Sequence, residues 1–132
     1  DARDASSLPP LFVTATRNLA IVYADQLGDD QKGEELGIKA RQTFNDDPEL
    51  AASLGAIYYR KGSYTDAARF LRQSLAKRPQ HAETLFFLGM SLFQLKNAPE
   101  SRAQLMEAIK LKLPPQEEHE ARRVLEELNR QG

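Results

Sequence analysis

The sequence contains no cysteine, and this absence removes three kinds of chemistry. The chain cannot form a disulfide, a thiolate zinc site or a cysteine nucleophile. It does not identify the compartment, because cytoplasmic and periplasmic proteins can both lack the residue. The localisation therefore stays open between these two for what we predict to be a soluble chain.

Long apolar runs and an excess of charge are also missing. No stretch approaches the ~18 consecutive apolar residues of a membrane span, and no signal peptide is visible. The net charge is −1, so no overall field attracts nucleic acid or an anionic membrane. We expect no nucleic-acid partner and no direct membrane insertion. Because the chain starts at Asp1 rather than methionine, we expect a mature product or a piece of a longer protein.

Patterns typical of catalysis or metal binding are scarce. There are two histidines, His81 and His119, and the neighbours of His119 in a helix would point in different directions. The acidic pairs 29–30 and 46–47 each precede a predicted helix, where aspartate caps the backbone rather than binding calcium. Phosphate loops and nucleophile elbows are absent. We therefore predict no enzymatic activity, no cofactor and no metal.

Helix signals, in contrast, recur along the whole chain. Asp47 followed by Pro48 is typical of a helix start, and Gly62 is typical of a helix end. Ser63 then has an acid three residues on, the spacing of a capping box, and Pro79 stops the helix that follows. Two helices joined by so short a connection must lie antiparallel.

Small residues mark the place where these two helices approach most closely. Gly55 in the first helix and Ala67 in the second leave room for the backbones to pack. The same unit returns 34 residues later, where Leu54-Gly55 becomes Leu88-Gly89. A fainter copy precedes it, with Gly33 and Gly37 in its second helix, which we expect to be the softest element. A period of this length in paired helices indicates a solenoid.

With these residues in register, the sequence resembles the tetratricopeptide repeat (TPR) family from about Leu11 onward. The resemblance implies an all-α, right-handed superhelical TPR solenoid of antiparallel helix pairs, with about three repeats and a C-terminal capping helix. We place the repeats at about 14–47, 48–81 and 82–115, and the terminal helix at about 116–130. Residues 10–132 form this domain, and residues 1–9 are predicted to be a flexible tail.

The resemblance also implies a concave groove lined by the first helix of each repeat. The candidate groove residues are Glu49, Ala52, Ala56, Tyr59, Arg60, Glu83, Phe86, Met90, Phe93 and Arg122. Asp25 would point inward from the fainter first unit. Small and apolar residues stand where carboxylate-clamp members of the family carry Lys, Asn and Arg, so a clamp is not expected.

Tyr59, Phe86, Met90 and Phe93 would give this groove an apolar floor, with charged residues at its edges. Such a surface suits an amphipathic helix or a peptide with bulky side chains. Alternatively, these aromatic residues only pack against the neighbouring repeat. Of two adjacent rings, we expect Phe87 rather than Phe86 to turn toward a neighbouring helix.

These features favour a non-catalytic interaction module that binds a protein or peptide partner as part of a larger protein or complex. One alternative is a self-assembly segment of a longer TPR array, associating through an exposed edge at Ala121, Val124, Leu125 and Leu128. Another is the substrate-positioning arm of a multidomain enzyme such as a glycosyltransferase. The near-regular, proline-delimited repeats favour a bacterial origin.

Overall fold

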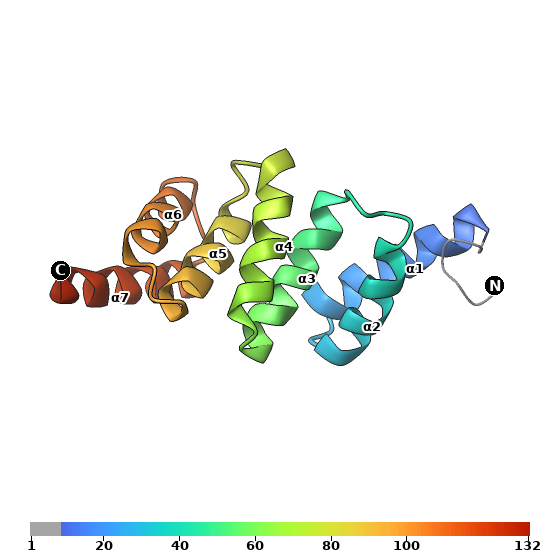
Figure 1. The fold of residues 1–132 in the computed structure, drawn as a ribbon, viewed down its shortest axis with the longest axis horizontal. Helices are drawn as coiled ribbons and strands as arrows, with labels where there is room; N and C mark the ends of the chain where they lie inside the picture. The colour runs from blue at the N-terminus through green and yellow to red at the C-terminus, as the bar shows by residue number, and fades with distance from the viewer. Residues whose placement is uncertain (1–8) are drawn as a thin grey trace.

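The computed structural model describes residues 9–132, and these residues form seven α-helices. The helices are α1 (Pro10–Asp25), α2 (Asp30–Arg41), α3 (Pro48–Lys61), α4 (Tyr64–Lys77), α5 (Ala82–Gln94), α6 (Ala98–Lys110) and α7 (Pro115–Gln131). The first six form three antiparallel pairs that follow one another along the long axis of the molecule, and α7 ends the row (Figure 1). The predicted all-α solenoid is confirmed. The predicted tail lies outside the described residues, apart from Pro9.

Most helix starts follow the expected capping chemistry. The Asp47 carboxylate accepts a hydrogen bond from the Leu50 N–H at 3.0 Å, and Asp29 caps α2 in the same way. Asn97 caps α6 with a similar backbone geometry. Ser63 is the N-cap of α4, but its side chain makes no capping bond, so the predicted capping box is wrong in that respect. The backbone angles of Ser63 resemble those at the other caps.

The expected close approach of α3 and α4 is present. A methyl group added at Gly55 would lie 2.6 Å from the Cγ and Cδ2 atoms of Leu71. Gly89 stands in the same relation to Leu105, between α5 and α6. The second and third repeats therefore pack in the same way: a leucine of the second helix lies against a glycine of the first helix.

In the first repeat the sizes at these two positions are reversed. Ile21 occupies the place of Gly55, and Gly37 occupies the place of Leu71. A methyl group at Gly37 would lie 2.8 Å from Leu54 of α3, and one at Gly33 would lie 3.2 Å from the backbone nitrogen of Ala24. These glycines let α2 approach both α1 and α3. The softness expected of α2 stays a prediction.

The terminal helix α7 covers the apolar side of the third repeat. Ala121, Val124 and Leu128 are fully or almost fully buried, and they share one core with Phe86 and Met90 of α5. The exposed edge expected at these α7 residues is therefore absent, with Leu125 alone of the four half-exposed. The reason is that α7 already uses its apolar stripe to cover α5 and α6.

Candidate functional site

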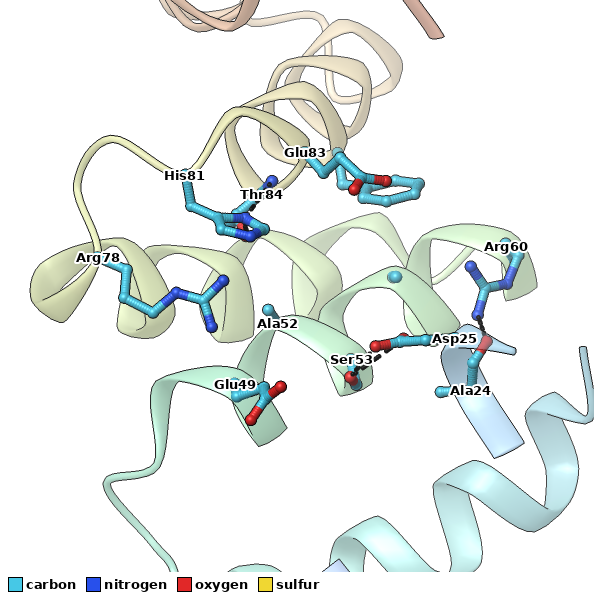
Figure 2. Close-up of a pocket in the computed structure, with 12 residues that line it drawn as sticks. Ala24, Asp25, Glu49, Ala52, Ser53, Arg60, Arg78, His81, Glu83 and Thr84 are labelled. Atoms are coloured by element: carbon cyan, nitrogen blue, oxygen red, sulfur yellow. Dashed lines mark hydrogen bonds between the residues drawn. The ribbon is translucent and has the colours of Figure 1, made fainter. Parts of the chain in front are cut away.

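A cavity of about 310 Å³ opens where the C-terminal end of α1 meets one face of α3 and the N-terminal part of α5 (Figure 2). It is lined by Ala24, Asp25, Glu49, Ala52, Ser53, Ala56, Arg60, Arg78, His81, Glu83, Thr84 and Phe87. The three helices that contribute most of these residues are the first helices of successive pairs. The cavity therefore lies on the face where the family resemblance places the groove.

The floor of the cavity is made of small side chains. Ala24 of α1 and Ala56 of α3 are buried, and Ala52 is half-buried one turn before Ala56. Because these side chains end at Cβ, the surface of α3 stays low between the longer side chains around it. The hollow is thus a direct result of alanine at two positions four residues apart.

The Asp25 carboxylate reaches across this floor from α1 to α3. The Ser53 hydroxyl lies 3.1 Å from both carboxylate oxygens and donates to them, as Figure 2 shows. Removal of water from the carboxylate raises the pKa of Asp25, while the Ser53 hydrogen bond and the charge of Arg60 lower it. The effect of burial is larger than the other two, so the pKa of Asp25 lies above that of an ordinary surface carboxylate.

Arg60 closes the cavity at the end of α3. Its guanidinium donates to both carboxylate oxygens of Asp30 and, at 3.2 Å, to the backbone oxygen of Ala24. The side chain therefore ties α3 to the end of α1 and the start of α2. Glu49 is held in a similar way, by a 2.7 Å ion pair with Arg17 of α1.

His81 and Arg78 lie on the other side of the cavity from Asp25 (Figure 2). His81 is the N-cap of α5, and its Nδ1 atom lies 2.8 Å from the Thr84 hydroxyl. Burial and the nearby Arg78 charge lower the pKa of His81, which favours the neutral ring at neutral pH. Within residues 9–132, neither Asp25, Arg78 nor Glu83 takes part in a salt bridge. The lining thus offers a donor side and an acceptor side.

Five of the candidate groove residues line the cavity: Glu49, Ala52, Ala56, Arg60 and Glu83. Phe86 and Met90 do not, since they are 2% and 3% exposed and lie under α7. The prediction that they form an open apolar floor is wrong, because the terminal helix occupies that surface. Phe87 lines the cavity instead, and its ring turns toward a neighbouring helix as expected, 5.6 Å from the Tyr59 ring of α3.

The other three candidates lie away from the cavity lining. The Tyr59 ring is half-buried, 5.6 Å from Phe87 and 5.8 Å from Tyr64 between ring centroids, and Phe93 is half-buried against the core under α7. Arg122 is exposed on α7 and pairs with Glu118 at 3.0 Å. Tyr59 and Phe93 thus agree with the alternative prediction, in which the aromatic residues pack against the neighbouring repeat.

Ser53, Arg78, His81 and Thr84 line the cavity but were not predicted to do so. Their sequence signal is positional. Ser53 and Phe87 stand at the same place in successive repeats, one residue beyond Ala52 and Phe86. Arg78 and His81 belong to the connection before α5, a segment that the inward-facing helix positions do not include.

The described residues show no arrangement for metal binding and no membrane span. No group of three or more His, Cys, Asp or Glu side chains in that part of the chain could hold a metal ion. None of its helices is both long enough and apolar enough to cross a bilayer. Neither finding bears on segments beyond those residues.

Comparison with known proteins places this geometry in a family. The family profile for the tetratricopeptide repeat matches residues 52–118, about half of the chain. A TPR repeat-containing protein of Pseudomonas aeruginosa is 36% identical over 81 residues, which is 61% of this chain and 14% of that protein. The chain therefore corresponds to a small part of that relative.

A solved structure also resembles the chain. A mutant of the O-GlcNAc transferase of Thermobaculum terrenum superposes with a TM-score of 0.68 at 25% sequence identity. The match covers 76% of this chain and 20% of the transferase chain. The helical arrangement described above is therefore one that also occurs within a much longer protein.

Proposed function

We propose, from the premise that the chain belongs to the tetratricopeptide repeat family, that it is a non-catalytic module that holds a partner peptide in the cavity between α1, α3 and α5. Repeats of this family mediate protein–protein interactions. The observation that carries the proposal is the alanine floor at Ala52 and Ala56, which keeps a 310 Å³ hollow open between charged walls.

The shape of the hollow favours an extended segment over a helix. A helix is about 10–12 Å across with its side chains, and the apolar floor that would have received its apolar face is covered by α7. An extended peptide can place a small side chain over the alanines. Its backbone N–H groups can then donate to Asp25 or Glu83, and its carbonyls can accept from Arg78. The partner peptide therefore need not carry a large apolar anchor.

A variant whose side chain fills the cavity tests this proposal through its affinity for peptides. Peptides selected on the wild-type chain from a displayed random library are titrated against Ala52→Arg, which places a long side chain in the hollow. The matched control is Ala103→Arg, the same change at an exposed position on α6. We expect at least a tenfold loss of affinity for Ala52→Arg and wild-type affinity for Ala103→Arg. Equal affinities, with circular dichroism showing that both variants fold, would contradict the proposal.

A second candidate function has one specific observation in its favour. The resemblance to an O-GlcNAc transferase, of which the matched part is only 20%, fits the expectation of a substrate-positioning arm in a longer enzyme. In that case the peptide in the cavity would be a segment of the enzyme's substrate. Incubating the selected peptides with the full-length protein and a sugar nucleotide, followed by mass measurement, distinguishes the two: a mass increase supports the arm, and unchanged peptides support the module alone.

Self-association is less well supported. The apolar α7 residues that would have carried it are buried within the molecule. Sedimentation equilibrium at increasing concentration checks this point directly, and a monomer is the expected result.

A further inference from the structure

Two carboxyl groups meet where α7 begins. Glu117, in the first turn of α7, lies within hydrogen-bonding reach of Glu83, in the first turn of α5. The Oε1 atom of Glu117 is buried and has no hydrogen-bond donor among the described residues. Ionised carboxylates can only accept hydrogen bonds, so this contact lacks a donor unless one of the two groups carries a proton.

Glu83 also lines the cavity beside Arg78 and His81, but no cation within residues 9–132 acts on Glu117. The other charged group that acts on Glu117 is Glu120 on α7 itself, which is also an acid. From α3, Tyr59 faces Glu120 and Arg123 of α7, and no group of α6 acts on Glu117. The nearby Arg122 is engaged with Glu118. The pair is thus an acid–acid contact at the joint between the third repeat and the terminal helix.

We propose that one proton shared between Glu83 and Glu117 fastens α7 to α5, and that the docking of the terminal helix therefore depends on pH. The protonated carboxyl supplies the missing donor, and its neighbour accepts. When the proton leaves, two negative charges face each other across the joint, and one oxygen stays buried without a donor. The surface that α7 covers includes Phe86 and Met90, so loosening of α7 would expose an apolar face of α5.

The direction of the effect follows from the carboxyl group. Burial, followed by the Glu83 contact, raises the pKa of Glu117 from 4.5 to about 7. A carboxyl whose pKa is higher in the folded state contributes stability that is fully present below about pH 4.5 and is lost as the pH rises through about 7. The change therefore falls in the neutral range, where few other side chains titrate.

Thermal unfolding of three chains tests the proposal. Wild type, Glu117→Gln and Glu126→Gln are compared at pH 5.5 and pH 8.5. The glutamine at position 117 keeps the shape and supplies a permanent N–H donor to Glu83, whereas Glu126 is an exposed acid on the same helix. We expect the wild type and Glu126→Gln to have a lower Tm at the higher pH, and Glu117→Gln to lose most of that difference. Asp25 and His81 are present in all three chains, so their titration cancels. An equal difference in all three would overturn the proposal.

Two local measurements in the wild type keep the test independent of how the variants fold. A carbon-13 titration of the Glu117 carboxyl should show a midpoint near neutrality, and a midpoint near 4.5 would overturn the proposal. Amide exchange, corrected for its intrinsic pH dependence, should show that Val124 of α7 loses protection with rising pH more than Ile57 of α3 does. Parallel losses at both residues would place the effect in the whole fold and overturn the assignment to α7.

Discussion

Gly55 of α3 and Leu71 of α4 form a contact in which the leucine side chain fills the space where any other residue would carry its Cβ. The same contact joins Gly89 and Leu105 one repeat later. Because each glycine sets how closely its two helices pack, the pair sets the internal geometry of a repeat. It also positions α3, whose adjacent face provides the floor of the cavity through Ala52 and Ala56.

The Gly55–Leu71 contact predicts a cost for the smallest possible substitution. Gly55→Ala should lower the free energy of unfolding by about 1–3 kcal/mol through overpacking, although alanine gains up to ~1 kcal/mol in helix propensity. The added Cβ would lie 2.6 Å from Leu71 Cγ, an atom too near the backbone to move away easily. Urea denaturation with circular dichroism measures the change.

A double-mutant cycle isolates the contact. In a Leu71→Ala background, which itself should cost about 2–5 kcal/mol, the space opposite Gly55 is open. Gly55→Ala should then be neutral or stabilising. An undiminished penalty in that background would show that the cost has a source other than Leu71.

Asp47 and Asp46 offer a test of capping against a surface ion pair. Asp47 caps α3 and binds Arg17 at 2.8 Å, whereas Asp46 pairs with Lys77 at 2.6 Å in an exposed position. We expect Asp47→Ala to cost about 0.5–2 kcal/mol of unfolding free energy and Asp46→Ala to change it by less than about 0.5 kcal/mol. Equal effects in urea denaturation at pH 7 would contradict this assignment.

The Asp47 effect should also depend on pH. Burial alone would raise the pKa of Asp47, but the hydrogen bonds from Arg17 and the Leu50 N–H outweigh it and lower the pKa below 3.8. A lowered carboxyl pKa gives stability that is present above pH 3.8 and is lost as the pH falls through the lower folded value. The difference between wild type and Asp47→Ala should therefore shrink in strong acid.

Ser53 should tune the carboxylate at the floor of the cavity. Its hydroxyl stabilises the ionised form of Asp25, so Ser53→Ala should raise the pKa of Asp25 further. A carbon-13 titration of the Asp25 carboxyl measures the shift. Ser91→Ala is the control, because that buried hydroxyl donates to the Phe87 backbone instead. A pKa of Asp25 that stays the same in Ser53→Ala would show that the hydrogen bond has no role in solution.

Phe86 should behave as a core residue and not as a ligand contact. Phe86→Ala should lower the unfolding free energy by about 3–5 kcal/mol, as for other buried phenylalanines. Phe93→Ala, at a half-buried position, should cost less. If Phe86→Ala left stability unchanged but weakened peptide binding, its burial under α7 would be contradicted.

The fold could be predicted from the sequence because its signals are local and repeated. Asp47, Gly62 and Gly55 each act within one helix pair, and the 34-residue period multiplies the signal. What could not be predicted is how the repeats use the shared face. An apolar residue such as Phe86 is expected at this position whether a partner or α7 covers it, because either contact buries an apolar side chain.

The role of the two glycines of α2 could not be predicted from the sequence either. Helix propensity alone marks Gly33 and Gly37 as weak points, but in the structure they admit Ile57 and Leu54 of the next repeat. The cavity, likewise, depends on Asp25, Ser53 and Thr84, which lie in three different repeats. Periodicity within one repeat does not show which side chains of three repeats converge.

The central claim is that the hollow between α1, α3 and α5 holds the partner. The most direct measurement is an amide NMR map of the wild-type chain with a selected peptide. We expect the largest shift changes at Ala52, Ser53 and Thr84, around the floor and wall of the cavity. Changes confined to Met106 and Leu125, which line a groove between α6 and α7, would contradict it.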